Sequence, residues 1–288
     1  MSAMRAARLV LLLLAAEGKK AAATHAAFKD SAITQLCEIG TNLAKAPAVA
    51  LAKYKVLTGA TTAARAAEML SNQAAASAAG ENTSTLFKAI ALAASECGAK
   101  ATQAIQTLGP IAATAALTGG KVAGGISEMA ELLRQTSYKS SAASNYCLGT
   151  HTAPTHASKL SELGCPSFED ITLPDDVAYD DTVISATGFE KLIPGSIKQT
   201  GAAATKCVFL KGGADTSSVL WRENQPRGIK IMAGFVDLAP HETANSEAAT
   251  MATLNSGTTN GWFPAATGNA AKTAFNTARE LNEFSTDN

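Results

Sequence analysis

The sequence is poor in aromatic side chains and carries no net charge. Phe, Trp and Tyr make up 5% of the 288 residues, whereas 47% are hydrophobic and alanine supplies much of that share. Few large rings and many small side chains favour long, thin helices over a thick globular core. Lys and Arg number 24, as do Asp and Glu, so the formal net charge is zero. Nothing in this balance indicates a nucleic-acid partner or an anionic membrane surface.

The sequence also lacks the motifs that usually carry chemistry. His151 and His156 stand five residues apart, without the H-E-x-x-H or C-x-x-C spacing of a zinc site. Gly119-Gly120-Lys121-Val122 has valine where a phosphate-binding loop needs a hydroxyl group. The pairs Asp175-Asp176 and Asp180-Asp181 are interpreted as solvated turns rather than acid/base dyads. We therefore expect no enzyme activity, no cofactor and no metal site, with a secreted hydrolase as the disfavoured alternative.

The N-terminus has the pattern of a secretory signal. Arg5 and Arg8 form a basic region before an apolar run, Leu9 to Ala16, and Ala21 to Ala23 provide small residues for cleavage. The apolar run is too short to cross a bilayer. The pattern predicts a signal peptide over residues 1–23, the alternative being an uncleaved N-terminal helix.

Five cysteines follow the predicted leader. They are Cys37, Cys97, Cys147, Cys165 and Cys207. In an exported chain cysteines are expected to pair, and the odd number leaves one over. Cys97 falls in an apolar helical seam, where cysteine behaves as a small hydrophobic residue, so we predict that it is free and buried. The other four allow three connectivities, and spacing alone does not choose between them.

A long apolar repeat, from Phe87 to Leu132, dominates the first half of the chain. Its positions alternate in steps of three and four and carry neither charge nor amide; they are Phe87, Ile90, Ala94, Cys97, Ala101, Ala104, Leu108, Ile111, Ala115, Thr118, Val122, Gly125, Met129 and Leu132. This is the seam of a coiled coil, and at 1.5 Å per residue it extends for roughly 68 Å. A compact bundle is the alternative, because Pro110 and the pairs Gly119-Gly120 and Gly124-Gly125 weaken or kink helices.

A second apolar repeat precedes the first and supplies a partner helix beginning near Ala26. Its seam is Ile33, Leu36, Gly40, Leu43, Pro47, Ala50, Tyr54 and Leu57. Pro47 predicts a kink or a break. Thr58 to Thr62 reads as a turn, with Gly59 at the helix end and a new helix starting near Ala63. The two helices are expected to form an antiparallel hairpin over residues 24–136.

The second helix has an expected interruption at Ala79 to Asn82. Asn82-Thr83-Ser84 is the only N-x-[ST] sequon, so Asn82 is a candidate glycosylation site in a secreted chain.

Helical periodicity fades after Arg134, and residues 137–288 are expected to form a loop-rich lobe. Short strands are predicted at Thr182 to Ser185, Cys207 to Leu210 and Ile229 to Ile231. A last helix is predicted from Asn269 to Phe284, with its apolar face formed by Phe275, Ala278 and Leu281. The expected fold is therefore mainly α, an elongated antiparallel helical hairpin bearing a disulfide-linked lobe with a few short strands.

Four features, in this order, resemble the N-terminal domain of class A trypanosome variant surface glycoproteins. They are Gln35-Leu36-Cys37; the sequence LTGGKVAGGISEMAELLRQ from Leu117 to Gln135; Cys147 followed by Gly164-Cys165; and CVFLKGG from Cys207 followed by IKIMAGFVDL from Ile229. The resemblance covers about residues 5 to 240. It implies that Cys37 pairs with Cys165 and Cys147 with Cys207, whereas Cys97 lies outside the usual four of the family.

The resemblance also implies a function. Members form a dense homodimeric coat on the cell surface, anchored by a glycolipid. The coat shields invariant proteins and varies antigenically under attack by host antibodies. Residues 24–288 would correspond to the N-terminal domain, reaching the outer face of the plasma membrane by the secretory pathway. The C-terminal domain and the anchor signal are not expected in this sequence. The alternative is a receptor for a host serum protein on the same scaffold.

Overall fold

The structure is a computed structural model. The residues that it describes are 27–136, 138–139, 144–145, 147–150, 159–166, 173, 177–190, 192, 195–198, 207–210, 212–213, 220–222, 229–240, 249–251, 254–256, 262–264 and 270–287. The predicted signal peptide lies outside these residues. Among the described residues, no helix is both long enough and apolar enough to cross a membrane.

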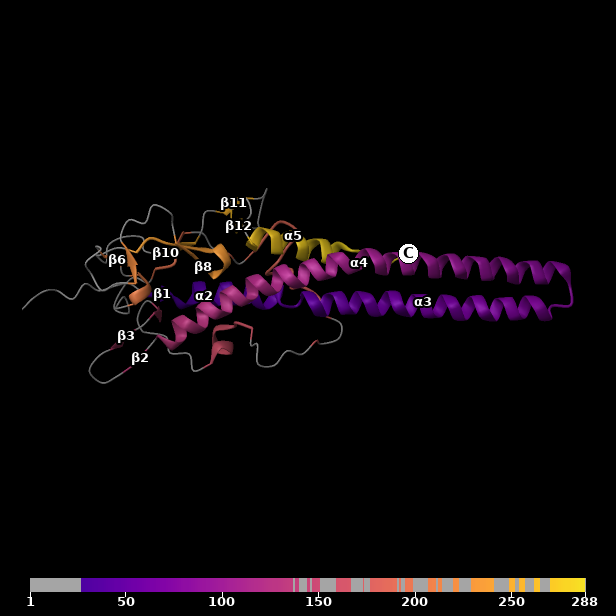
Figure 1. The fold of residues 1–288 in the computed structure, drawn as a ribbon, viewed down its shortest axis with the longest axis horizontal. Helices are drawn as coiled ribbons and strands as arrows, with labels where there is room; N and C mark the ends of the chain where they lie inside the picture. Colours follow the sequence, from indigo (N-terminus) through magenta and orange to yellow (C-terminus); the bar gives the residue numbers. More distant parts are fainter. Residues whose placement is uncertain are drawn as a thin grey trace, which may run out of the picture.

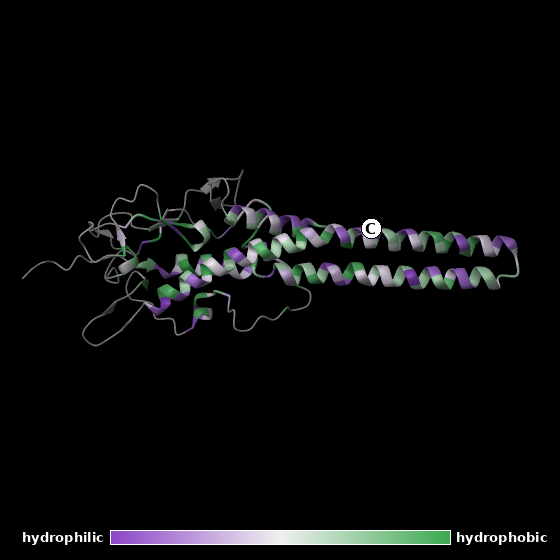
Figure 2. Ribbon diagram, in the orientation of Figure 1, coloured by the Kyte–Doolittle hydropathy of each residue, from purple (hydrophilic) through white to green (hydrophobic). Residues whose placement is uncertain are grey.

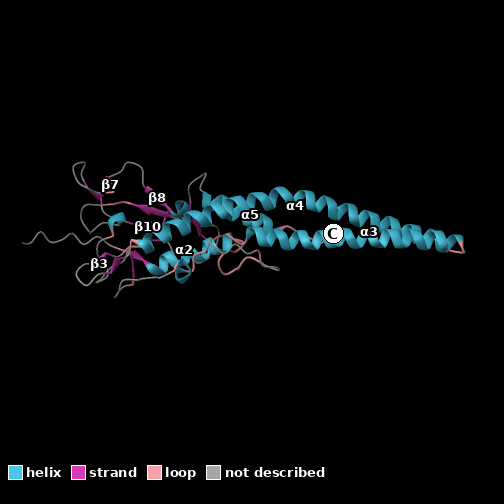
Figure 3. Cartoon of the chain, turned by 60° about the horizontal axis from the view of Figure 1, so that its bottom comes forward, coloured by secondary structure: helices cyan, strands magenta, loops and turns pink. Residues whose placement is uncertain are grey.

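Two long helices form an extended hairpin. After α2 (Asp30–Leu43), the helices α3 (Ala46–Ser77) and α4 (Glu81–Gln135) run antiparallel and side by side (Figure 1). With 55 residues, α4 extends for roughly 82 Å. The far half of the hairpin projects beyond all the other elements, whereas the strands gather at the opposite end (Figure 3). This confirms the predicted elongated hairpin and excludes the compact bundle.

The breaks in the helices differ in part from those predicted. Pro47 stands in the first turn of α3, just after a turn at residues 44–45, as expected of a residue that has no N–H to donate. The predicted turn at residues 58–62 is wrong, because α3 continues through it. The hydroxyl groups of Thr58, Thr61 and Thr62 donate to carbonyl oxygens one turn earlier in the same helix. The hairpin turn lies instead at residues 78–80, which overlap the predicted interruption at Ala79 to Asn82.

The seam of α4 differs from the predicted seam at alternate positions. The buried residues of α4 are Ala91, Ala101, Leu108, Ala112, Ala115, Gly119, Val122, Ala123, Ile126, Ser127, Ala130 and Leu133. Positions such as Ala101 and Leu108 were predicted, but Ala91 is buried where Ile90 was expected. The small residues bring the two helices close together: a Cβ atom built on Gly98 would lie 3.3 Å from the Cβ of Ala64 in α3.

Cys97 lies outside the observed seam, which includes the next residue instead. Because Gly98 rather than Cys97 faces α3, the thiol is exposed, and the prediction that it is buried is wrong. Cys97 is the only described cysteine without a disulfide partner.

Proline and glycine do not end α4. Pro110 lies inside the helix, which bends between the hairpin and the head (Figure 1). Gly119 is buried where α4 crosses α2, and a Cβ atom built on it would lie only 2.6 Å from the carbonyl oxygen of Leu43. Only glycine therefore allows the two backbones to approach so closely at this point.

The head consists of short strands and single-turn helices. The strands are β1 (Phe28–Lys29), β2 (Tyr138–Lys139), β3 (Ser144–Asn145), β4 (Leu148–Gly149), β5 (Gly195–Ser196), β6 (Gly212–Gly213), β7 (Trp221–Arg222), β8 (Ile229–Ile231), β9 (Val236–Leu238), β10 (Ala249–Met251), β11 (Leu254–Ser256) and β12 (Trp262–Pro264). The 3-10 helices are η1 (Leu160–Leu163), η2 (Val208–Leu210) and η3 (Met232–Gly234). The largest described sheet is antiparallel, in the order β5-β10-β9-β8, and β1 pairs in parallel with β4.

Two of the three predicted strands are not strands. Residues 182–185 form a turn whose Ile184 makes an isolated bridge to Phe189, and Val208 to Leu210 form η2. Ile229 to Ile231 is β8, as predicted. Both failed segments are buried for part of their length, and such short apolar stretches look alike whether they are extended or turned.

The last helix, α5 (Ala270–Glu283), fastens the head to the hairpin. Its predicted apolar face is confirmed, because Phe275, Ala278 and Leu281 are buried. Phe275 packs edge-on against Phe189, with ring centroids 5.5 Å apart, and Phe189 packs likewise against Phe235 at 5.4 Å. These three rings join three separate segments of the chain in one apolar cluster.

Candidate functional site: the crosslinked head and the hairpin surface

Two disulfides crosslink the head, and one of them also ties it to α2 at the base of the hairpin. The structure joins Cys37 in α2 to Cys165, which follows η1, and it joins Cys147 to Cys207. These are the pairs that the family resemblance implies. The four residues are buried, and the bridges span 128 and 60 residues of sequence. Crosslinks across such long loops remove much conformational freedom from the unfolded chain.

A buried amide reinforces the first crosslink. Asn42 in α2 is 2% exposed; its Nδ2 donates to the carbonyl oxygen of Asp180 at 3.3 Å, and its Oδ1 accepts from the Asp180 N–H at 3.0 Å. Next to it, the Thr41 hydroxyl donates to the carbonyl oxygen of Gly164 at 2.8 Å. In the sequence, the only signal of Asn42 is a lone amide beside the seam residue Leu43. The Asp180 carboxylate accepts from Thr182 within its own turn, as expected of a solvated turn.

The hairpin beyond the head has one apolar and one polar face. On α3, exposed apolar residues recur every three or four positions, which places them along one side of the helix; they are Val56, Ala60, Ala63, Ala67 and Leu70. On α4 the corresponding side carries Leu86, Ile90, Ala93 and Cys97, all exposed. The opposite side is more polar, since Arg65, Glu68, Ser95 and Thr102 line one shallow notch between the helices, although this side also exposes Leu92. Green segments reach to the far end of both helices in Figure 2.

The comparison with known families decides the identity. The sequence model of the trypanosome variant surface glycoprotein family, A-type, matches residues 8–284. This chain belongs to that family. Its fold is similar to that of a solved structure named "Structure of MITat 1.1", with a TM-score of 0.64 and 20% sequence identity over 90% of this chain and 69% of that chain. No curated protein matches the chain.

As a member of this family, the chain is a surface coat glycoprotein. The length of its hairpin and the crosslinked head at one end agree with that role. A stiff helical pair can set the thickness of a coat, and the loops at its end can differ in sequence without changing the helices.

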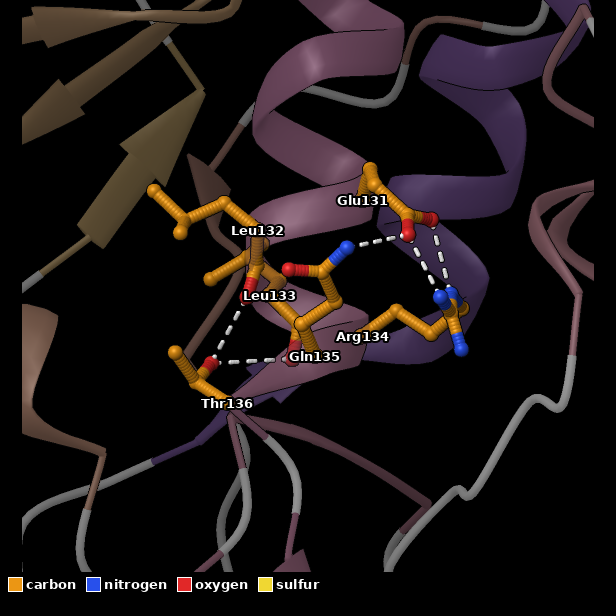
Figure 4. Close-up of polar contacts among 6 residues, drawn as sticks. All are labelled: Glu131, Leu132, Leu133, Arg134, Gln135 and Thr136. Atoms are coloured by element: carbon orange, nitrogen blue, oxygen red, sulfur yellow. Dashed lines mark hydrogen bonds and ion pairs between the residues drawn. The ribbon is translucent and has the colours of Figure 1, made fainter.

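In this variant surface glycoprotein, side-chain hydrogen bonds stabilise the C-terminal end of α4. This end belongs to the 117–135 segment that carries the family resemblance. Arg134 donates from Nε to Glu131 Oε2 at 2.7 Å, and Gln135 Nε2 donates to Glu131 Oε1 at 2.6 Å (Figure 4). The hydrogen bond from Arg134 lowers the pKa of Glu131, so the carboxylate stays charged. The Thr136 hydroxyl donates to the carbonyl oxygens of Leu132 and Leu133 just before the helix ends.

The remaining predicted residues of this glycoprotein lie as follows. Asn82 is exposed in the first turn of α4, at the tip of the hairpin. Cys97 lies on the apolar face. The histidines His25, His151, His156 and His241, and also Asp175-Asp176, fall outside the described residues. Within the described part of the chain, no group of three His, Cys, Asp or Glu residues is placed to hold a metal ion.

Proposed function

We propose that this chain forms a homodimeric coat whose exposed head varies antigenically, shields the parasite surface and thereby evades host antibodies. The observation that carries the proposal is the separation of two parts in one molecule. One part is a helical pair with a packed seam, and the other is a crosslinked head of short strands and loops. Substitutions in head loops leave the helical seam unchanged, so the surface seen by antibodies can differ while the coat keeps its thickness.

The apolar face of the hairpin supports a second copy as its partner. Val56, Leu70, Leu86 and Ile90 are 55%, 66%, 60% and 44% exposed. From Val56 to Leu70 the face is roughly 21 Å long, and two adjacent helices are about 20 Å wide, which gives roughly 400 Å². A patch of this size matches the largest apolar patches of ordinary monomers, which often mark interaction sites. Because the formal net charge of the chain is zero, charge repulsion between two copies does not oppose self-association.

The dimer is tested by charging one face at a time. Ile90→Arg introduces a cation on the apolar face, whereas Leu92→Arg places the same cation on the other side of α4, one turn before Ser95. Leu92 is 63% exposed, so neither change disturbs a buried residue. Analytical ultracentrifugation of the wild type and of Leu92→Arg should give twice the mass of one chain, and Ile90→Arg should give a monomer. A dimeric Ile90→Arg variant would exclude this face as the interface.

The coat itself is tested on intact cells. Antibodies raised against the native head should bind cells that display the chain densely, whereas antibodies against the hairpin region 63–99 should bind only the purified protein. Equal binding of both antibodies to intact cells would contradict a shielding coat.

We further propose that residues 1–23 are removed as a signal peptide and that Asn82 carries an N-linked glycan. Mass spectrometry of the secreted chain after glycosidase treatment should place the new N-terminus near residue 24 and convert Asn82 to Asp. An unmodified Asn82 in the untreated protein would refute the glycan, and Asn82→Gln is the matched control.

A further inference from the structure

Cys97 leaves an exposed thiol on the apolar face of the hairpin. It is the one described cysteine without a disulfide partner, and it lies two helical turns after Ile90 on the same side of α4. The other four cysteines form disulfides, so this chain matures where thiols are oxidised, and an open thiol there can enter disulfide exchange. A partner packed on this face protects the thiol.

The level of Cys97 along the hairpin follows from the contact between the two helices. A Cβ atom built on Gly98 would lie 3.3 Å from the Cβ of Ala64, so these two residues are level with each other. Because α3 and α4 run antiparallel with the same rise per residue, one step back in α4 matches one step forward in α3 (Figure 1). Cys97 is therefore level with residue 65, midway between Ala63 and Ala67. Both alanines are exposed on the apolar face.

The coat role sets how a second copy lies on this face. In a coat the heads of all copies point away from the cell, so two paired copies lie parallel. A two-fold axis along the hairpin places α3 of each copy against α4 of the other and keeps every residue at its own level. Cys97 of one copy then faces the gap between the two alanines of the other. Ile90, one heptad earlier, faces the gap between Leu70 and Ala74, so both side chains are placed as knobs over holes, the packing of helical bundles.

The area of the face is sufficient for a second copy. From Val56 to Ala74 the face is roughly 27 Å long, and two adjacent helices are about 20 Å wide, which gives roughly 540 Å² on each copy. Two copies together bury roughly 1,100 Å², just above the roughly 1,000 Å² that a specific interface needs. Cys97, level with residue 65, lies at the middle of this stretch. An interface of this size has little area to lose, so added bulk at its centre opposes pairing.

We propose that Cys97 of each copy packs between Ala63 and Ala67 of the other copy, and that a group attached to its sulfur prevents the two copies from pairing. The inference rests on the proposed homodimer. The two Cys97 thiols do not form a disulfide with each other, because the two α4 helices lie diagonally in the resulting four-helix bundle. With neighbouring axes about 8–10 Å apart, the diagonal is about 11–14 Å, whereas the Cα atoms of a disulfide lie within about 7 Å.

The packing is tested by placing one thiol in each copy. The wild-type chain is co-expressed with an Ala67→Cys chain whose Cys97 is replaced by serine, and the purified mixture is treated with oxidised glutathione. A non-reducing gel should show a covalent pair of the two chains, which neither protein forms alone. Ala66→Cys in the same Cys97→Ser background is the matched control, because residue 66 is exposed but lies off the apolar face, and it should form no covalent pair.

Labelling of the thiol gives a second readout in the unsubstituted chain. N-ethylmaleimide should react with wild-type Cys97 about tenfold more slowly than with the Ile90→Arg monomer when about nine-tenths of the wild-type chains are paired, because only separated copies expose the sulfur. Once labelled, the wild-type chain should sediment as a monomer. Equal labelling rates, or labelled chains that still sediment as dimers, would overturn the proposal.

The outcomes separate this inference from the homodimer itself. A wild type that is dimeric in the ultracentrifuge but gives no covalent pair with the Ala67→Cys chain, or an equal covalent pair with the Ala66→Cys chain, would refute the position of Cys97 and leave the homodimer intact. A wild type that sediments as a single chain would refute the homodimer, and this inference with it.

Discussion

Gly119 and Gly120 are neighbours in α4 with opposite surroundings, and they provide a direct test of the hairpin's close approach. A Cβ atom built on Gly119 would lie 2.6 Å from the carbonyl oxygen of Leu43, a separation that real Cβ atoms essentially never show. A Cβ atom built on Gly120 would meet no atom within 4 Å. Alanine at the first position must push α4 away from α2, whereas alanine at the second meets open space.

The magnitude follows from two opposing effects. Replacing glycine by alanine inside a helix gains about 1 kcal/mol of helix propensity at either position. Overpacking costs about 1–3 kcal/mol and applies to Gly119→Ala alone. Gly120→Ala should therefore be more stable than the wild type by about 1 kcal/mol. Gly119→Ala should be less stable than Gly120→Ala by about 1–3 kcal/mol, since the gain in propensity cancels in this comparison.

The assay is thermal unfolding followed by circular dichroism. At about 2–4 °C per kcal/mol for a domain of this size, the two variants should melt roughly 2–12 °C apart. Equal melting temperatures would refute the close crossing of α2 and α4. Two variants that were both destabilised would instead show that α4 is not a continuous helix through this pair.

Two further predictions concern the crosslinked head and the end of α4. Replacing Cys37 and Cys165 together by alanine should lower the free energy of unfolding in urea by about 2–5 kcal/mol, because the bridge closes a 128-residue loop; Cys97→Ser should change nothing, and an equal loss in both variants would contradict the pairing. Glu131 has a pKa lowered below 4.5 by Arg134, so its contribution to stability is present above pH 4.5 and lost as the pH falls through the lowered value. Glu131→Gln should therefore be less stable than the wild type by up to about 1 kcal/mol at pH 7 and equal to it in strong acid; a difference that persists in acid would contradict this account.

The architecture could be predicted from the sequence because it depends on a property repeated over many turns. Apolar residues recur at helical spacing from Ile33 to Leu57 and from Phe87 to Leu132, and no single proline or glycine outweighs that sum. The turn could not be placed by composition. The segment from Thr58 to Thr62 has the composition of a turn, but its threonine hydroxyl groups donate to carbonyl oxygens of α3. The packing of α3 along α4 outweighs the weak tendency of Gly59 to end a helix.

The head was less predictable, since its contacts join residues far apart in sequence. The Asn42 amide meets the Asp180 backbone 138 residues later, and no local pattern signals that meeting. The cavity of about 330 Å³ that is lined by Tyr179, Ile184 and Ala278 likewise depends on where α5 lies against residues 179–186.

The seam of α4 shows how an alanine-rich repeat becomes ambiguous. An apolar seam can be followed along the sequence in steps of three then four residues, or of four then three. Both patterns include every seventh residue, such as Phe87, Ala94 and Ala101. They differ only in the residue chosen between each of these pairs. Where the intervening pair is Ile90 and Ala91, hydrophobicity alone favours the larger residue. Close packing of two helices favours the smaller one, because it allows the backbones to approach. The structure follows packing, and the apolar residues that it leaves outside are the ones available to a second copy of the chain.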